Sequence, residues 1–413
     1  IRTTDPGLTA KINLAYNNKD EHRATLSLDV DSIAPKTIGL SDKLEEIFSF
    51  NFDSELTFKD KKNSILNAKL QNFTFRNDER TKSIRNLHFC DNRNEEQRLT
   101  MINSDFIDFS IIGQYDYNSI LYSLYKLTAT HTPALFPNAE AKEKGNCNYI
   151  FKCDIKDSHF VSELLNLPVT INQPSFINGV CNDDKEILTI NTTLNDIEIY
   201  KSRYRSLEFN GESTNKALTI NSHLVKPGSS KKYDKLDDDL RIDVNFKLFN
   251  DTIQNSMTWG NKKEKKRING KLSMEAMLNR DTDDMLFVKA NINPDSIIHN
   301  DSVWYISGST VQGNMNKIKV NGLYLYNDNQ HLRLDGTIGK EKEDVLNISA
   351  SNLEVSTILD LVRFRILKFN GNATGTAHAT SLLSAPDVSG DFNVDSFKID
   401  NGYLGNAKLN GGW

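Results

Sequence analysis

The stretch FNGNATGTAHATSLLSAPDVSGDFNVDSFKIDNGYLGNAKLNGGW, Phe369–Trp413, carries the clearest pattern in the chain. Small residues over Gly371–Thr380 predict a strand, which a Pro-containing turn follows. The apolar residues of the next strand alternate with polar ones, and a one-residue slip between Val394 and Phe397 predicts a β-bulge. An Asn-Gly pair at Asn401, flanked by apolar alternation, predicts a hairpin turn. The stretch therefore predicts three consecutive strands.

The composition favours an extended sheet over a compact core. The chain has 413 residues, of which 38% are hydrophobic, and its mean hydropathy is −0.51. A compact protein of this length would bury a larger share of its surface. In a single-layer sheet only alternate residues need to be apolar, because one face is sheltered and the other meets water. The sequence therefore predicts a mainly β fold: an elongated curled sheet, or half-pipe, that forms a solenoid-like groove with a few short helices.

Short stretches with helical spacing interrupt the strands. Apolar residues recur at this spacing after a possible capping residue, Asp116, and again just before Pro168. The pair Asn210-Gly211 predicts a turn between two strands. The predicted helices are Ser41–Phe48, a helix that contains Ile120–Leu127, Ser158–Asn166 and Ser351–Arg363.

These changes of pattern divide the chain into four predicted segments. Residues 1–104 and 188–350 are predicted groove segments made of strands, and residues 105–187 add short helices and a Pro-containing loop. Residues 351–413 begin with a short helix and close with the strands of the C-terminal stretch, which we expect to continue beyond the chain. No apolar run is long enough for a transmembrane helix, and no secretory pattern opens the chain. We therefore expect an internal segment of a longer protein.

The charge balance argues against nucleic acid as a partner. Fifty basic and 55 acidic residues give a net charge of −5, whereas binding to a phosphate backbone needs clustered positive charge. One basic turn, Lys262–Arg267, has the charge to contact anionic lipid headgroups, although a solvated turn is the simpler interpretation.

No motif in the chain indicates a catalytic or metal site. The eight histidines are scattered, and the acidic run Asp281–Asp284 lacks the glycine and distal glutamate of an EF-hand loop. No nucleophile elbow or phosphate-binding glycine loop occurs. The sequence therefore predicts neither an enzyme nor a bound cofactor or metal ion. No Cys-x-x-Cys pair occurs, and we expect unpaired or only opportunistically paired thiols at Cys90, Cys147, Cys153 and Cys181.

The order of these patterns resembles one protein family. The succession of a small-residue strand, a Pro-containing turn, an alternating strand, a turn and a further strand is similar to the modules of the TamB family, AsmA-like proteins of the Gram-negative envelope known as translocation and assembly module components. The most specific piece is a strand-Gly-x-Tyr-Asp-helix element that resembles the Bacteroidota-type members. The similar pieces are Thr4–Leu40, Ser104–Phe136, Phe151–Leu167, Ile348–Leu361 and Phe369–Trp413.

This resemblance implies a setting and partners. Proteins of the family lie in the periplasm, are anchored in the inner membrane, and are linked to outer-membrane biogenesis. The resemblance therefore implies inner-membrane attachment through an N-terminal part, and contact with an outer-membrane β-barrel protein of the Omp85 type through a C-terminal part. Neither part is included in this sequence.

The resemblance and the alternation together predict a lipid-binding groove. A continuous apolar face in a watery compartment favours acyl chains, and removing apolar area from water contributes about 25 cal/mol per Å². We expect a bridge-like protein that carries phospholipid between the two membranes. The predicted lipid-groove residues are Ile242, Val244, Phe246, Leu248, Leu332, Leu334, Ile338, Phe392 and Val394.

Two other interpretations compete with lipid transport. An assembly factor for outer-membrane β-barrel proteins would use exposed strand edges to pair with a partner strand. An enzyme on a β-solenoid, such as a polysaccharide lyase, would need carboxylates or basic residues clustered at repeat spacing, and the sequence contains no such cluster.

Overall fold

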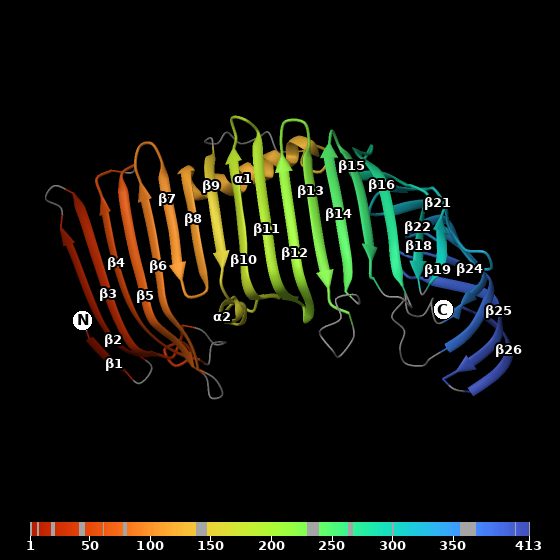
Figure 1. Ribbon diagram of the computed structural model, residues 1–413, viewed down its shortest axis with the longest axis horizontal. Coiled ribbons are helices and arrows are strands. Elements are labelled where there is room, and N and C mark those ends of the chain that lie inside the picture. Colours follow the sequence, from red (N-terminus) through yellow and green to blue (C-terminus); the bar gives the residue numbers. More distant parts are fainter. Residues whose placement is uncertain are drawn as a thin grey trace. The chain divides into compact units, whose positions relative to one another are not determined.

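The computed structural model of the chain is mainly β, with strands that run side by side and two short helices among the described residues (Figure 1). The structure describes residues 2–5, 8–17, 21–40, 46–60, 62–76, 81–137, 147–228, 239–262, 267–299, 301–355, 369–400 and 402–412. The described residues fall into two compact units. Unit 1 comprises residues 1–128, 139–216 and 220–227, and unit 2 comprises residues 129–138, 217–219 and 228–413.

In unit 1, each strand from β1 to β12 pairs antiparallel with the next strand along the chain. This up-and-down order is the one that short connections allow, because antiparallel neighbours can be joined by tight turns, and the alternating apolar pattern fixes their register. The strands are β1 (Arg2–Asp5), β2 (Leu8–Asn17), β3 (His22–Ile33), β4 (Ile47–Phe58), β5 (Ser64–Arg76), β6 (Thr81–Arg93), β7 (Arg98–Ser104), β8 (Ile107–Gln114), β9 (Asn148–Ile155), β10 (Val169–Asn182), β11 (Ile187–Ile199), β12 (Ser202–Ser213) and β13 (Leu218–Lys226).

Unit 2 contains the remaining strands, in a second antiparallel arrangement. They are β14 (Leu240–Phe249), β15 (Thr252–Gly260), β16 (Ile268–Arg280), β17 (Leu286–Ile292), β18 (Asp295–His299), β19 (Ser302–Ile306), β20 (Ser309–Gly313), β21 (Lys317–Tyr326), β22 (His331–Gly339), β23 (Val345–Glu354), β24 (Phe369–Thr380), β25 (Asp387–Ile399) and β26 (Gly402–Gly412). Strand β16 pairs with β17 near its end and with β18 near its start. Pro294 lies between β17 and β18, where its missing N–H removes a ladder bond and explains the break.

The C-terminal stretch folds as its pattern predicts. Strands β24, β25 and β26 pair in order, and the predicted bulge appears as a register shift between Val394 and Phe397. Residues Ile399 and Gly402 face each other across the predicted hairpin turn. The predicted class, a mainly β antiparallel curled sheet with few short helices, is therefore confirmed.

Two of the four predicted helices are confirmed. Helix α1 spans Tyr117–His131 and helix α2 spans His159–Leu164. Of the predicted helix Ser41–Phe48, residues 41–45 lie outside the described part, but Ile47 and Phe48 belong to strand β4. Most of the predicted helix Ser351–Arg363 also lies outside the described part, and its first four residues extend strand β23.

The turn predicted at Asn210-Gly211 is wrong. Both residues lie inside strand β12, where they pair with Asn191 and Ile190 of β11. A Cβ added at Gly211 would lie 3.3 Å from the ring of Phe209, so the glycine leaves room for that ring. An Asn-Gly pair is therefore not a sufficient turn signal inside a strand that its neighbours hold in register. The division into four segments and the basic turn at Lys262–Arg267, most of which lies outside the described residues, stay predictions.

Candidate functional site

The candidate site is one face of the sheet, which we call the inner face. In an antiparallel pair, residues directly opposite each other point to the same side. The strand register therefore defines one row of side chains across unit 2. This row consists of Leu248, Ile253, Ala276, Ala290, Val311, Val320, Gly336, Leu346, Ala379 and Val388. Every member is apolar, so the inner face of unit 2 is continuous from β14 to β25.

All nine predicted groove residues lie on this inner face. Ile242, Val244 and Phe246 precede Leu248 at intervals of two residues along β14. On β22, Leu332, Leu334 and Ile338 share a face with Gly336 of the row, and on β25 Phe392 shares a face with Val388. Eight of the nine side chains are half-buried, so they offer surface to a ligand. Val394 is only 1% exposed and therefore packs within the sheet.

Two clusters support the C-terminal half of this face. Leu334 and Ile338 pack against buried Val320, Leu346 and Ala379. Phe392 packs with Val394 around buried Ala373 and Phe397. Small residues of β24 lie opposite larger ones of β25, for example Gly375 opposite Phe392. This pairing of small and large side chains explains the small-residue strand seen in the sequence.

Sequence reasoning missed the bulkiest members of the inner face. Trp259 lies directly opposite Ile242, and Met257 lies opposite Val244. Leu272 continues the row of Met257 on β16. The signal was present as the alternation Ile253, Asn255, Met257, Trp259, but the polar Asn255 interrupts it. Only the register with Phe246 shows that Asn255 lies on the apolar side.

Unit 1 has an inner face of the same kind. The row Ala68, Phe89, Ile102, Phe109, Cys153 and Ile177 crosses six strands. Part of this inner face is covered by helix α1, whereas the described residues of unit 2 include no strand-covering helix of this length. The side chains of Ile120 and Leu127 on α1 join a buried cluster with Ile111, Tyr149 and Leu188 of the sheet. Figure 1 shows α1 behind the strands of unit 1, so the face turned toward the viewer is the outer face.

Polar contacts hold α1 against the ends of the strands. Ser123 donates a hydrogen bond to Asp183 at 2.5 Å, and the Cys147 thiol lies 3.1 Å from the Ser119 hydroxyl. Cys147 and Cys181 are fully buried beneath the helix. Burial, with the nearby Asp183 carboxylate, raises the pKa of Cys181 to about 12. Because both side chains are enclosed, Cys147 and Cys181 serve as packing groups, and all four cysteines are free.

A charged network lies on the inner face beside the start of α1. Arg98 donates two hydrogen bonds to Asp91, at 2.8 Å from Nε and 2.7 Å from Nη2. Thr100 donates to the same carboxylate at 2.8 Å, and Tyr117 of α1 donates to it at 3.1 Å. Burial alone would raise the pKa of Asp91, but the bonds from Arg98 and Thr100 outweigh burial and lower its pKa. The sequence analysis did not identify this network, although Asp91 continues the inward alternation of Leu87 and Phe89.

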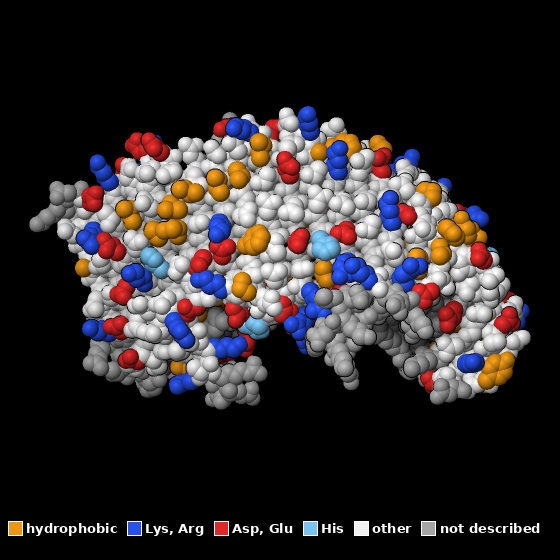
Figure 2. Space-filling view, in the orientation of Figure 1, with side chains coloured by type: hydrophobic (Ala, Val, Ile, Leu, Met, Phe, Trp, Pro, Cys, Tyr) orange, Lys and Arg blue, Asp and Glu red, His pale blue; other side chains and the backbone are white. Residues whose placement is uncertain are grey.

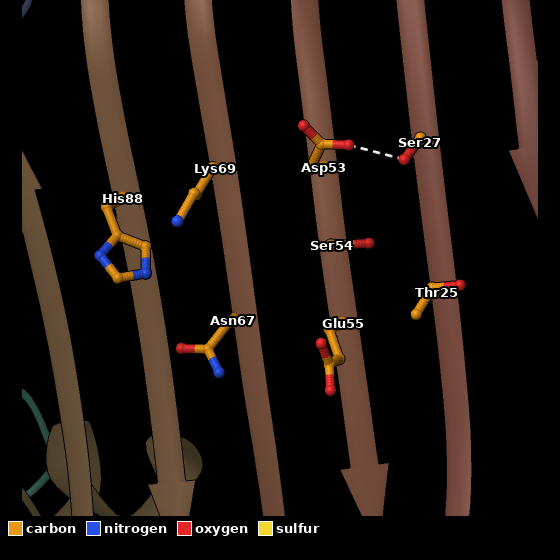
Figure 3. Close-up of a pocket in the computed structure, with 8 residues that line it drawn as sticks. All are labelled: Thr25, Ser27, Asp53, Ser54, Glu55, Asn67, Lys69 and His88. Carbon is orange, nitrogen blue, oxygen red and sulfur yellow. Dashed lines mark hydrogen bonds between the residues drawn. The ribbon is translucent and has the colours of Figure 1, made fainter.

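The outer face is mixed in character. Figure 2 shows charged side chains of both signs scattered over the face turned toward the viewer, together with patches of hydrophobic side chains. On the outer face of unit 1, Ile112 and Ile150 pair across β8 and β9 and are exposed. Figure 3 shows a shallow depression on strands β3 to β6, about 460 Å³ in volume, where Ser27 donates a hydrogen bond to Asp53 at 2.6 Å. Its lining is Thr25, Ser27, Asp53, Ser54, Glu55, Asn67, Lys69 and His88. Such a polar, open surface does not suit an acyl chain.

Among the described residues, no group of three or more His, Cys, Asp and Glu side chains is placed to hold a metal ion. Within the same part of the chain, no helix has the length and apolar character needed to cross a membrane. Comparison of the chain with protein-family models, with curated proteins and with solved structures finds no match.

Proposed function

We propose that this protein binds phospholipid along its inner face and carries it between membranes. One observation supports the proposal above the others: an unbroken row of apolar residues, half-buried at Leu248, Ile253, Ala290, Val311 and Val388 and buried at most positions between them, crosses unit 2 from β14 to β25. Monomeric soluble proteins rarely leave an apolar strip of this kind without a partner. An acyl chain is a flexible apolar rod, which matches a narrow strip that crosses many strands.

The energetics favour this ligand. Each methylene transferred from water to an apolar surface contributes about 0.8 kcal/mol. An acyl chain that covers several rows of the inner face therefore gains enough free energy to stay bound, while its polar headgroup lies off the apolar rows. The outer face carries charges of both signs and keeps the sheet soluble on that side.

The setting that we propose is the periplasm of a Gram-negative bacterium. The similarity of the sequence pattern to the TamB family supports it. In this proposal the complete protein is anchored in the inner membrane and reaches an outer-membrane β-barrel partner. It supplies phospholipid to the outer membrane and does not act as an enzyme.

Photo-crosslinking tests the lipid proposal. A photoreactive amino acid in place of Trp259, on the inner face, should crosslink to copurified phospholipid, and Val244→Asp or Phe246→Glu should abolish that crosslink. Asn245→Glu is the matched control, because Asn245 lies between these two residues and is exposed on the outer face. Crosslinking that survives both inner-face charges, or that Asn245→Glu removes equally, would contradict the proposal.

A second candidate function is β-barrel assembly, and one observation favours it. Strand β26 pairs with β25, and its side chains are largely exposed, including Tyr403 and Leu404. An exposed strand with apolar side chains is a template for pairing with a strand of another protein. Copurification with a barrel protein but without lipid would favour this role, and Leu404→Pro should then remove the barrel protein because proline prevents strand pairing.

A further inference from the structure

A polar pocket lies in unit 1 at the end of the inner face. It has a volume of about 260 Å³, and the β6–β7 turn and the start of α1 surround it. Arg93 and Arg98 belong to a single row of the inner face, since the register pairs them directly. Two rows further along the same strands come Phe89 and Ile102. The pocket therefore joins a charged end to an apolar surface, which is the layout of a phospholipid.

The two arginines suit a phosphate group. Arg98 holds Asp91 through Nε and Nη2, and its guanidinium lies over the ring of Tyr117 at 3.9 Å, so its position is fixed. Its remaining Nη1 is 3.9 Å from Asp116, beyond hydrogen-bond distance, and has donors for an incoming oxygen. Arg93 reaches the same carboxylate at 3.3 Å from a partly exposed position. Fixed guanidinium groups bind phosphate oxygens with little further ordering.

The carboxylates of the pocket suit an amine. Glu95, Glu96 and Asp116 are exposed at its rim, so acidic groups outnumber the two arginines in its lining. A ligand that carries only negative charge would be repelled. A zwitterion complements both the positive arginines and the negative carboxylates, and a primary ammonium can donate hydrogen bonds to carboxylates. A quaternary ammonium prefers aromatic faces, and Arg98 already occupies that of Tyr117.

Helix α1 supplies a second apolar wall beside this pocket. Tyr117, Leu121 and Tyr125 recur every four residues, and they are 46%, 74% and 37% exposed. The Tyr117 hydroxyl reaches Asp91 and Thr100, one row inside Arg93 and Arg98. Through Tyr117, this stripe of α1 therefore borders the inner face and presents exposed apolar surface next to the pocket.

We propose that this pocket holds the headgroup of a phospholipid with a primary amine. The phosphate lies at Arg93 and Arg98, the ammonium lies at the rim carboxylates, and the acyl chains lie between the α1 stripe and the inner face of unit 1. This inference rests on the proposed lipid function, to which it adds a headgroup specificity and a fixed position along the sheet.

Native mass spectrometry of the whole chain tests the site. The chain is incubated with equimolar phosphatidylethanolamine, phosphatidylglycerol and diacylglycerol that share the same acyl chains. We expect the wild type to retain phosphatidylethanolamine about tenfold over either competitor. Arg93→Gln should reduce the retention of both phospholipids relative to diacylglycerol. The double change Glu95→Gln, Glu96→Gln should equalise the two phospholipids without reducing their sum.

Lys152→Gln serves as the control, because Lys152 is an exposed residue of the outer face of unit 1 and should leave the preference unchanged. Circular dichroism of each variant confirms that the sheet is intact. Equal retention of diacylglycerol and phosphatidylethanolamine by the wild type would overturn the headgroup site and leave lipid binding standing. A preference for phosphatidylglycerol would overturn the amine assignment. Retention of no lipid at all would overturn the proposed function itself.

Discussion

Unit 1 and unit 2 share an apolar inner face but differ in what lies on it. In unit 1, helix α1 packs on the strand ends and buries Ile111 and Tyr149 to 4% exposure each. In unit 2, Ile242, Val244 and Phe246 keep part of their surface in solvent. Cover by α1 therefore turns part of the inner face of unit 1 into core, whereas the β14 residues of unit 2 keep exposed surface; elsewhere in unit 2, neighbours within the sheet are enough to bury Val394.

The largest expected effect follows from this contrast. Ile111→Asp places a charge beneath α1, and Val244→Asp places the same charge on the uncovered face. We expect Ile111→Asp to cost more than about 4 kcal/mol, since a buried charge has no partner there. Val244→Asp should cost about 1–2 kcal/mol, because water still reaches that face. Urea unfolding, followed by circular dichroism, measures both. Equal losses would show that α1 does not distinguish the two faces.

The next largest loss of stability is expected in the network of Asp91, Arg98, Thr100 and Tyr117 at the start of α1. Asp91→Asn removes the carboxylate that Arg98 holds with two hydrogen bonds and leaves only the more distant, exposed Asp116 as its charged neighbour, so we expect a loss of about 2–3 kcal/mol of unfolding free energy. Asp154→Asn is the matched control in unit 1. Its partner is the exposed Lys152, so the loss should be below about 0.5 kcal/mol. Hydrogen exchange of the α1 amides should rise in Asp91→Asn alone. Unchanged exchange would show that the network does not stabilise the helix.

Lowering the pH should weaken the ion pair between Asp91 and Arg98. The pKa of Asp91 is lower in the folded protein than in the unfolded chain, where it is about 3.9. Its contribution is therefore complete above that value and is lost as the pH falls through the folded pKa. Asp196 and Asp344 also have lowered pKa values. These residues remain in Asp91→Asn, so the difference between wild type and variant should shrink below pH ~4. A constant difference from pH 7 to 3 would contradict this role.

Much of the fold could be predicted from local patterns. The bulge after Val394 and the helix that contains Ile120–Leu127 both follow from spacing alone. The strand at Ile47 could not be predicted, because Leu44, Ile47 and Phe48 fit a helical spacing equally well and pairing of β4 with β3 and β5 decides the outcome. Tertiary pairing overrides local propensity wherever a short apolar run fits two periods.

For the candidate site, the sequence could predict only which face of the sheet each residue occupies. Alternation placed nine residues on one face, and the register agrees. Alternation does not show, however, whether other side chains or a helix bury a residue on that face. It could not distinguish Val394, which is buried, from Phe392 two residues before it. It also gave no reason to connect Arg98 with Tyr117, because their contact depends on where α1 packs.

Adding a side chain at a crowded glycine should destabilise the two units by similar amounts. Gly336 of unit 2 has φ +131°, and an added Cβ would lie 2.2 Å from the Val345 carbonyl oxygen. Gly113 of unit 1 has φ +145° and would meet the Asn148 oxygen at 2.1 Å. Alanine at either position should cost about 2 kcal/mol. Gly411→Ala is the control, since nothing lies within 4 Å of its added Cβ. Thermal unfolding of the three variants measures the losses, and tolerance at Gly113 alone would mean that the sheet of unit 1 is the looser one.

The smallest effect is expected on the outer face, where the two units do not differ. Ile150 of unit 1 is 58% exposed and lies next to Tyr149, which is buried beneath α1. Met277 of unit 2 is 49% exposed and follows Ala276 of the inner row. Serine at Ile150 or Met277 removes little buried area, so each change should alter the unfolding free energy by less than about 0.5 kcal/mol and leave lipid crosslinking intact. The comparison is sharp because neighbours in sequence point to opposite faces. If Ile150→Ser removed the crosslink while Val244→Asp kept it, the lipid would lie on the outer face, and the face that α1 covers would be only a core.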